Sequence, residues 1–206
     1  LSFGFITWYK GTDQLIKGLA VTKSINGKPL RLIIAGGPSS TQRHKGHYQR
    51  YYQSVLNSAK NLPHVTITGF LSAKEIDLWF RACDLAIYPY RAVMSSSGPL
   101  SLSLAYHKPT LLSHAMCAYL DSPDVGQSQI EAKINSEEMT LPQETGRWEM
   151  FLREAAKTKN LKKLVNFSNI LSEKRSFIKL ASAYNEALIR RNAGVDASLG
   201  LVVRNA

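Results

Sequence analysis

Short apolar runs alternate with longer segments of helical periodicity along the first half of the chain. The apolar runs predict five strands, over residues 2–6, 30–36, 65–69, 84–88 and 110–113. Between them, apolar positions recurring every three or four residues predict helices over 12–24 and 45–60. Strands that alternate with helices need crossover connections, which pair the strands in parallel. The pattern therefore predicts a doubly wound α/β fold, with a parallel sheet and helices on both faces.

The segment after residue 71 carries the clearest helix signal. Ser72 and Glu75 have the spacing of a capping box, in which each side chain bonds the other's backbone N–H. Apolar residues then follow on one helical face, at Ile76, Trp79, Phe80 and Cys83. We expect a helix that begins just after Ser72.

Residues 98–106, GPLSLSLAY, are ambiguous. Alternating Leu and Ser has the period of a half-buried strand. Gly98 before Pro99 is nevertheless typical of a helix start, and Lys108-Pro109 ends the segment. We predict a helix here, with a strand as the alternative.

Beyond residue 125 the pattern is weaker. It predicts helices over 147–157 and 172–191, followed by a poorly ordered tail over 192–206. Residues 1–191 are then one domain that includes the C-terminal helices. Because the chain starts at Leu1 and enters a strand at once, we expect it to be a piece of a longer protein.

Composition excludes several classes of protein. Of the 206 residues, 44% are hydrophobic, and 13 Gly and 8 Pro follow no period, which argues against disorder and collagen-like repeats. No apolar run reaches the length of a membrane span, and no signal segment precedes the first strand. Two cysteines, Cys83 and Cys117, make no disulfide framework. We expect a cytoplasmic protein.

The net charge is +11, and residues 151–206 carry 11 Lys and Arg against 4 Asp and Glu. Such an excess attracts nucleic acid, an anionic membrane or an acidic substrate, or is simply a solvated face. The basic run KTKNLKKL lacks the interleaved aromatics of nucleic-acid binders, so we expect no nucleic acid. Peripheral contact with an anionic inner membrane face has six candidate charges: Lys157, Lys159, Lys162, Lys163, Lys174 and Arg175.

Loops that follow parallel strands are where ligands collect, because helix N-termini there favour anions. Lys10 precedes the first helix, and Gly36-Gly37 follows the second strand. The serines before Gly98 open the helix over 98–106. Together these loops predict a phosphate cradle, although each alone is also read as an ordinary turn, a cap or a solvated charge. Neither GxGxxG nor GxxxxGK[ST] is present.

Histidine and cysteine pairs give no metal site. His44 and His47 are three positions apart, as are His114 and Cys117, and neither pair has an evident third ligand in the sequence. We expect His44 and His47 to be solvated, His114 and Cys117 to lack the second half of a zinc site, and no metal to bind.

Four motifs carry a family resemblance: GFITWYKG (4–11), LIIAGGP (32–38), VTITGFLSAKEIDLWFRACDLAIYPY (65–90) and SSSGPLSLSLAYHKPTLLS (95–113). In this order they resemble the C-terminal, nucleotide-sugar-binding domain of GT-B glycosyltransferases of group 1, the glycogen-synthase-like type. KRSFIKLASAYNEAL (174–188) resembles the closing helix of that domain. The resemblance implies a Rossmann-like domain whose N-terminal, acceptor-binding partner domain is missing from this chain.

The resemblance also implies an activity. It indicates the donor-binding half of a retaining hexosyltransferase, which transfers a sugar from a UDP- or GDP-sugar to a glycoconjugate. The enzyme would need no metal or other cofactor, and this chain alone would be inactive. The implied diphosphate-binding residues are Lys10, Gly36, Gly37, Ser96, Ser97 and Gly98. Phe70 and Leu71 would contact the nucleoside, and further candidates are Gly4, Arg91, Ser95 and Ser103.

Two departures from the family pattern stand out. Phe5 occupies the position after the first glycine where such enzymes commonly carry Arg. Their two glutamates eight positions apart are replaced by Met94 and Leu102, or by Ser95 and Ser103, depending on register. These departures keep open a second hypothesis, a non-catalytic basic α/β module for nucleotides or polyanions, either a degenerate paralogue or a nucleic-acid binder.

Overall fold

The computed structural model describes the backbone of residues 1–94 and 96–203 and the side chains of residues 1–94 and 96–190. The chain divides into two compact units, Leu1–Leu171 and Ser172–Ala206, which we describe separately. The candidate Ser95 lies outside the described residues.

The first unit contains six parallel strands. They are β1 (Ser2–Phe3), β4 (Leu32–Ala35), β5 (Val65–Ile67), β6 (Ala86–Tyr88), β7 (Thr110–Ser113) and β8 (Thr140–Leu141). Pairing gives the orders β1-β4-β5 and β6-β7-β8, with Ile33 opposite Thr66 and Ile87 opposite Leu111. The pattern of short apolar runs therefore predicted the five parallel strands up to residue 113. Each predicted range exceeds the observed strand by a few residues at most.

Backbone hydrogen bonds of Leu1 join the two halves of the sheet. Its amino group donates to the Leu85 carbonyl at 2.7 Å, and its carbonyl accepts from the Ile87 N–H at 2.8 Å. The complete order is thus β5-β4-β1-β6-β7-β8. Numbered along the chain, this is 3-2-1-4-5-6, the order of a doubly wound Rossmann-like sheet, which confirms the predicted fold class.

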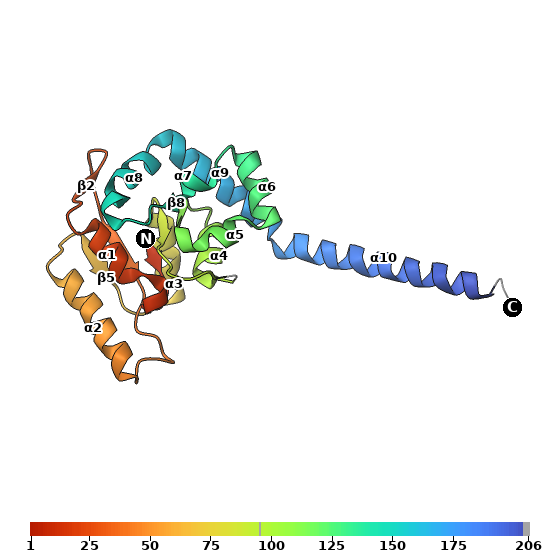
Figure 1. The fold of residues 1–206 in the computed structure, drawn as a ribbon, viewed down its shortest axis with the longest axis horizontal. Helices are drawn as coiled ribbons and strands as arrows, with labels where there is room; N and C mark the ends of the chain where they lie inside the picture. Colours follow the sequence, from red (N-terminus) through yellow and green to blue (C-terminus); the bar gives the residue numbers. More distant parts are fainter. Residues whose placement is uncertain (95, 204–206) are drawn as a thin grey trace. The chain divides into compact units, whose positions relative to one another are not determined.

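Helices cover both faces of this sheet (Figure 1). Leu32 and Ile34 of β4 point into the larger core, which also contains buried side chains of α1 (Thr12–Leu19) and α2 (Gly46–Lys60). Ile33 and Ala35 alternate with them and join a second core. That second core contains Phe80 of α3 (Ala73–Ala82) and Leu102 of α4 (Gly98–Ala105). The alternation within β4 is what requires two helical layers.

Two local predictions are confirmed. Ser72 caps α3, since its Oγ accepts from the Glu75 N–H at 3.3 Å while Glu75 Oε2 accepts from the Ser72 N–H at 2.8 Å. Residues 98–105 form the helix α4 rather than a strand, with Ser97 as the N-cap and Pro99 in the first turn. The helix-start signal therefore outweighed the alternation of Leu and Ser.

A hairpin after α1 was not predicted. The helix ends at Leu19, and β2 (Ser24–Ile25) pairs with β3 (Lys28–Pro29) where the prediction extended the helix to residue 24. The turn residues Asn26 and Gly27 both have positive φ, 49° and 80°. Asn-Gly is the typical sequence of such a tight hairpin turn, so this signal was present in the sequence.

Helical elements follow both β7 and the last strand, β8. These are η2 (His114–Met116), α5 (Cys117–Leu120), α6 (Pro123–Ala132), α7 (Ser136–Met139), then after β8 η3 (Thr145–Arg147), α8 (Trp148–Ala155) and α9 (Thr158–Lys174). The predicted helix 147–157 corresponds to α8, whereas α9 was not predicted as a separate helix. A Cβ on Gly18 would lie 2.7 Å from Trp148, so α8 closes tightly over α1.

The second unit contains α10 (Phe177–Val203). Its backbone is helical to Val203, where the sequence predicted a tail from residue 192, and residues 204–206 lie outside the described residues. Among the described residues, no helix is both long and apolar enough to cross a bilayer. Cys83 and Cys117 are free thiols, as expected.

Candidate functional site

The strand order places one crevice at the middle of the sheet. β1 and β6 are neighbours, and the chain leaves them in opposite directions across the sheet, so their carboxyl ends form the topological switch point. The loops that follow these strands, residues 4–11 and 89–98, therefore meet. Ligands of doubly wound sheets bind at this kind of crevice.

Lys10 places an ammonium group in this crevice. A Cβ built on Gly4, which has φ 119°, would lie 2.6 Å from Lys10 Nζ and 3.0 Å from Pro99 in the first turn of α4. Nζ also lies 5.3 Å from the centroid of the Tyr90 ring. No ion pair of Lys10 occurs within the described part of the chain, and burial lowers its pKa to about 8. A cation without a carboxylate partner, beside a helix N-terminus, suits a phosphate group.

Two glycines allow the loops around Lys10 to approach one another. A Cβ on Gly36 would lie 1.9 Å from the Gly4 carbonyl oxygen, and one on Gly11 would lie 1.9 Å from the Pro89 carbonyl oxygen. Gly36 is buried, as is Gly37, whose carbonyl accepts from the Ile6 N–H at 2.9 Å. Gly36 and Gly37 therefore position the loop after β1. This role is additional to the phosphate binding that the family resemblance implies.

The first turn of α4 forms the opposite side of the crevice. Ser97 Oγ lies 2.9 Å from the Tyr90 hydroxyl and 3.4 Å from the Leu100 N–H, so the hydroxyl is occupied as an N-cap. Burial raises the pKa of Tyr90 to about 12. Gly98 is exposed, with no atom within 4 Å of a Cβ placed there, and Ser96 is exposed beside it. Pro99 has no N–H and the Leu100 N–H bonds Ser97 Oγ, so the N–H of exposed Gly98 is the donor that this turn offers to an anion.

Ser103 does not face the crevice. Its side chain is completely buried and hydrogen-bonds the Tyr88 hydroxyl, which also donates to the Pro99 carbonyl at 2.8 Å. This network holds α4 against β6. We therefore remove Ser103 from the candidate ligand-binding residues, because no ligand can reach its hydroxyl.

Arg91 is also committed to the protein. Its guanidinium binds the Asp13 carboxylate through two hydrogen bonds of 2.8 and 2.6 Å and donates to the Trp8 carbonyl at 2.6 Å. Burial opposes ionisation of Asp13, but hydrogen bonds from Arg91 and Tyr51 and the charge of Arg91 outweigh it and lower the pKa of Asp13. Arg91 therefore positions the Lys10 loop. Sequence reasoning missed Asp13, which no local pattern distinguishes.

Replacing Arg91 by glutamine should lower the free energy of unfolding by about 1–3 kcal/mol at pH 7, the usual loss for hydrogen bonds to a charged group. Because the pKa of Asp13 is lowered in the folded state, the stabilisation is present above its ordinary value of 3.8 and is lost as the pH falls below that value. Urea unfolding at pH 7 and pH 3 measures both effects.

The control for this prediction is Arg81→Gln, which removes an exposed helical pair with Asp77 and should cost much less stability, because solvent screens exposed ion pairs. Equal losses in the two variants, or a loss at Arg91 that does not change with pH, would contradict the assigned role of Arg91.

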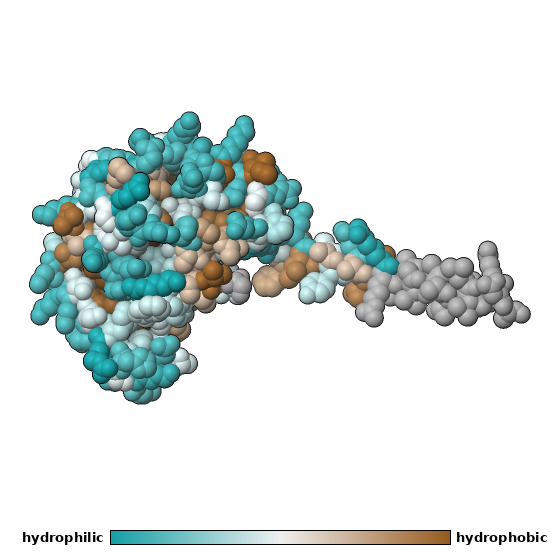
Figure 2. Space-filling model, in the orientation of Figure 1, coloured by the Kyte–Doolittle hydropathy of each residue, from teal (hydrophilic) through white to brown (hydrophobic). Residues whose placement is uncertain are grey.

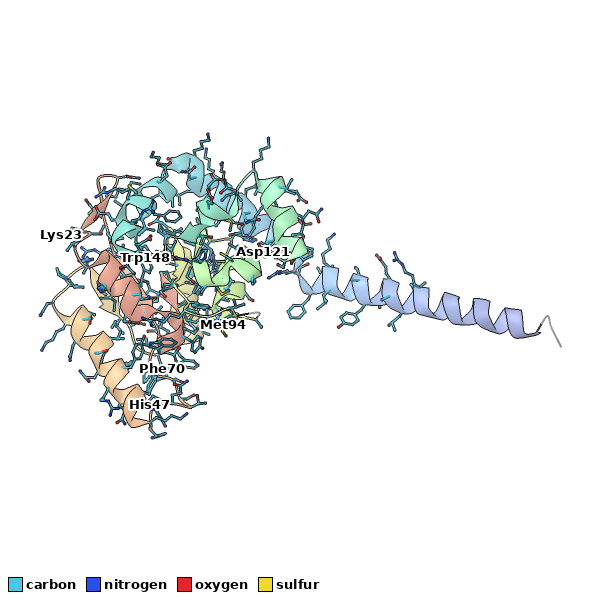
Figure 3. The ribbon with its side chains drawn as sticks, viewed as in Figure 1. Lys23, His47, Phe70, Met94, Asp121 and Trp148 are labelled. Carbon is cyan, nitrogen blue, oxygen red and sulfur yellow. The ribbon has the colours of Figure 1, made fainter. Side chains whose placement is uncertain are left out.

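Exposed aromatic rings lie beside the crevice, at the ends of β1 and β5. Phe70 is 61% exposed and Phe5 is 46% exposed, and their ring centroids are 6.1 Å apart in an edge-on arrangement. The Phe70 ring lies over Gly37, 3.1 Å from a Cβ placed there. Leu71, by contrast, packs against the second core. Figure 3 shows Phe70 toward the same edge of the Leu1–Leu171 unit as His47. The sequence treated Phe5 only as a missing cation, whereas the structure makes it part of an apolar platform.

The predicted histidine and cysteine pairs stay isolated. His114 Nδ1 lies 3.5 Å from Cys117 Sγ, and no group of three or more metal-ligating side chains occurs among the described residues. His44 and His47 are both exposed.

One family model and several solved structures match this chain. The family model described as "Glycosyl transferases group 1" matches residues 1–119. No curated protein matches the chain significantly. The family match covers the loops after β1, β4, β5 and β6, which form the crevice.

Solved structures share the fold at low sequence identity. HepE from Anabaena in complex with UDP-glucose is 17% identical with TM-score 0.67, over 92% of this chain and 48% of that protein. The C-terminal domain of the group 1 glycosyl transferase LpcC from Francisella tularensis is 18% identical with TM-score 0.60, over 85% of each chain. Sucrose-phosphate synthase from Thermosynechococcus elongatus is 14% identical with TM-score 0.65, over 94% of this chain and 45% of that one. The chain thus spans about half the length of HepE and of the synthase, and 85% of the isolated C-terminal domain of LpcC.

Proposed function

This chain belongs to the group 1 glycosyl transferases, and from that premise we propose that it is the donor-binding half of a retaining hexosyltransferase. In this proposal the crevice binds a UDP- or GDP-sugar, and a glycoconjugate acceptor occupies a separate N-terminal domain of the same protein. The opposing domain completes the cleft, so the chain alone binds donor but transfers no sugar.

The observation that carries the proposal is the position of Lys10. Its ammonium group lies beside the first turn of α4, near Gly4 and Pro99, without a carboxylate partner among the described residues. When the bond between the anomeric carbon and the diphosphate breaks, negative charge develops on the leaving diphosphate. A fixed cation and fixed N–H dipoles stabilise that charge without reorganisation, which is how electrostatic preorganisation lowers a barrier.

The remaining donor contacts follow from the surrounding loops. The diphosphate lies between Lys10 and the N–H groups of Ser96, Ser97 and Gly98, while the base rests against Phe70. HepE, which shares the fold, is described in complex with UDP-glucose, and this supports a UDP-sugar as the donor. Phe5 adds a second ring beside Phe70 in place of the family's usual Arg.

We expect UDP or GDP to bind this chain in the presence of a chelator, because Lys10 and the α4 terminus supply the positive charge that a metal would otherwise provide. Isothermal titration of UDP and GDP with and without EDTA measures this. Uridine, which lacks phosphates, is the control and should bind much more weakly. Affinity that appears only with Mg²⁺ or Mn²⁺, or equal affinity for uridine and UDP, would contradict the proposed diphosphate site.

A second candidate function is a nucleotide-binding module without catalysis. Phe5 replaces a cation, and the positions of the two family glutamates are filled by Met94 and Leu102 or by Ser95 and Ser103. Leu102 packs in the second core and Ser103 is buried. Assay of the full-length protein for release of UDP from UDP-sugars distinguishes the two: tight binding without turnover favours the module.

A further inference from the structure

The proposed diphosphate site has a cation on one side and a helix N-terminus on the other. The cation is Lys10, and exposed Gly98 offers its backbone N–H from the start of α4. Phe5 stands where the family commonly has Arg, so the site depends strongly on how these two groups are held. Groups that are fixed in advance bind an anion better than groups that must first be ordered, because less entropy is lost on binding.

The ring of Tyr90, in the loop after β6, contacts the cation. Lys10 Nζ lies 5.3 Å from the centroid of this ring and 5.9 Å from the centroid of the Tyr9 ring, and both distances are within the range of a cation–π contact. The two rings meet edge-on, with their centroids 6.4 Å apart. They form an uncharged corner around the ammonium group, so its charge remains available to an anionic ligand.

The hydroxyl of the same tyrosine contacts the other side of the site. It lies 2.9 Å from Oγ of Ser97, the N-cap of α4, and this Oγ also accepts from the Leu100 N–H at 3.4 Å. Tyr90 thus helps to fix the residue directly before Gly98. Burial raises the pKa of Tyr90 to about 12, so its hydroxyl is neutral at pH 7 and does not repel a phosphate group.

Tyr90 is itself held by its surroundings. Its carbonyl accepts from the Ser113 hydroxyl of β7, and its ring packs edge-on against Tyr88, with the centroids 5.6 Å apart. Tyr90 is 3% exposed, so it acts on a ligand through its neighbours and not by direct contact. The visible face of the Leu1–Leu171 unit is mainly hydrophilic, with hydrophobic residues in small separate groups (Figure 2), which accords with the burial of such aromatic side chains.

We propose that Tyr90 is a positioning residue of the donor site, which fixes the Lys10 ammonium with its ring and the N-terminus of α4 with its hydroxyl. This inference rests on the proposed function, because it takes the crevice to bind a nucleoside diphosphate. Tyr90 lowers the cost of ordering both groups when the donor binds. Two substitutions separate its contacts: Tyr90→Phe removes the hydroxyl and keeps the ring, whereas Tyr90→Leu removes both.

Titration calorimetry of UDP and GDP with the full chain tests the proposal. We expect Tyr90→Phe to weaken binding about threefold, because one hydrogen bond at the α4 cap is lost. Tyr90→Leu should weaken binding about 20-fold, because the cation–π contact is lost as well. The matched control is Tyr106→Phe, which removes a hydroxyl that donates to Asp77 at 2.9 Å at the other end of α4 and should leave the affinity unchanged. Circular dichroism checks the fold of each variant.

Double-mutant cycles show whether Tyr90 acts through the two groups. Once Lys10→Met has removed the cation, Tyr90→Leu should weaken binding no more than Tyr90→Phe does. Once Ser97→Ala has removed the cap hydroxyl, Tyr90→Phe should have no further effect. Wild-type affinity in both Tyr90 variants, or losses that simply add in both cycles, would overturn the proposal.

NMR of the chain with isotope-labelled lysine gives a readout that is independent of affinity. The lysine signal that disappears in Lys10→Met should be displaced by the ring current of Tyr90. Tyr90→Phe should retain this displacement and Tyr90→Leu should lose much of it, whereas a signal without displacement in the wild type would contradict the contact between ring and ammonium group. If Tyr90→Leu does not fold, the wild-type signal and the Ser97→Ala cycle still decide.

The titrations also separate this inference from the proposed function. If the wild type binds neither UDP nor GDP, the proposed function fails. If the wild type binds and the Tyr90 variants bind equally well, only the role of Tyr90 fails.

Discussion

Gly36→Ala should destabilise the domain by about 3 kcal/mol or more, because its Cβ would lie 1.9 Å from the backbone oxygen of Gly4. Backbone on both sides leaves no flexible side chain to move aside. The Gly4 N–H also donates to the Ala35 carbonyl at 3.0 Å, so the added methyl group would separate β4 from the loop that carries Lys10. Urea unfolding of the wild type and the variant gives the loss directly.

A matched control exists in α6. A Cβ on Gly126 would meet nothing within 4 Å, so Gly126→Ala should be neutral or should stabilise by up to about 1 kcal/mol through helix propensity. A variant Gly36→Ala with wild-type stability would show that the loops after β1 and β4 do not make this close contact.

Lys10→Met should weaken the binding of UDP or GDP by about 1–3 kcal/mol, roughly 5- to 150-fold, because it removes a charge-assisted contact to the diphosphate. Methionine retains most of the apolar stem and removes only the ammonium charge. Titration calorimetry at pH 7 measures the difference. Lys17→Met, on the exposed face of α1, should bind as the wild type does.

The same variant should be more stable than the wild type when no ligand is present. Burial lowers the pKa of Lys10 to about 8, so the charged form is disfavoured in the folded state. This penalty is fully present below pH 8 and disappears as the pH rises toward the ordinary value of 10.5. We expect Lys10→Met to gain about 1 kcal/mol at pH 7, a typical size for a stabilising substitution, and the gain to vanish near pH 10.

If Lys10→Met weakens nucleotide binding and raises the free energy of unfolding, Lys10 is a binding residue that reduces stability. A variant that loses stability and affinity together would instead make Lys10 a packing residue. Unchanged nucleotide affinity would remove it from the diphosphate site. The affinity of the wild type for the donor should also fall as the pH rises through 8, because Lys10 of the unliganded protein loses its proton there.

Local sequence signals predicted much of the fold because they act between residues close in the chain. The capping box of Ser72 and Glu75, and Pro99 at the start of α4, each depend on contacts within one helical turn. The alternation of apolar runs and helical stripes predicted the doubly wound sheet. Lys10 and Gly98 became candidates for the site because they lie in loops that follow strands. The Asn26-Gly27 hairpin was equally local, and its signal was overlooked.

Only the tertiary structure decided what each loop residue does. Arg91 was a candidate for phosphate until its partner Asp13, distant in the chain, was found to occupy it. Ser103 was a candidate until burial against Tyr88 removed it, and Phe5 gained a role only beside Phe70. Residue type and spacing along the chain predict which groups can meet a ligand. Whether another part of the protein already binds them depends on contacts between distant segments, which local periodicity does not encode.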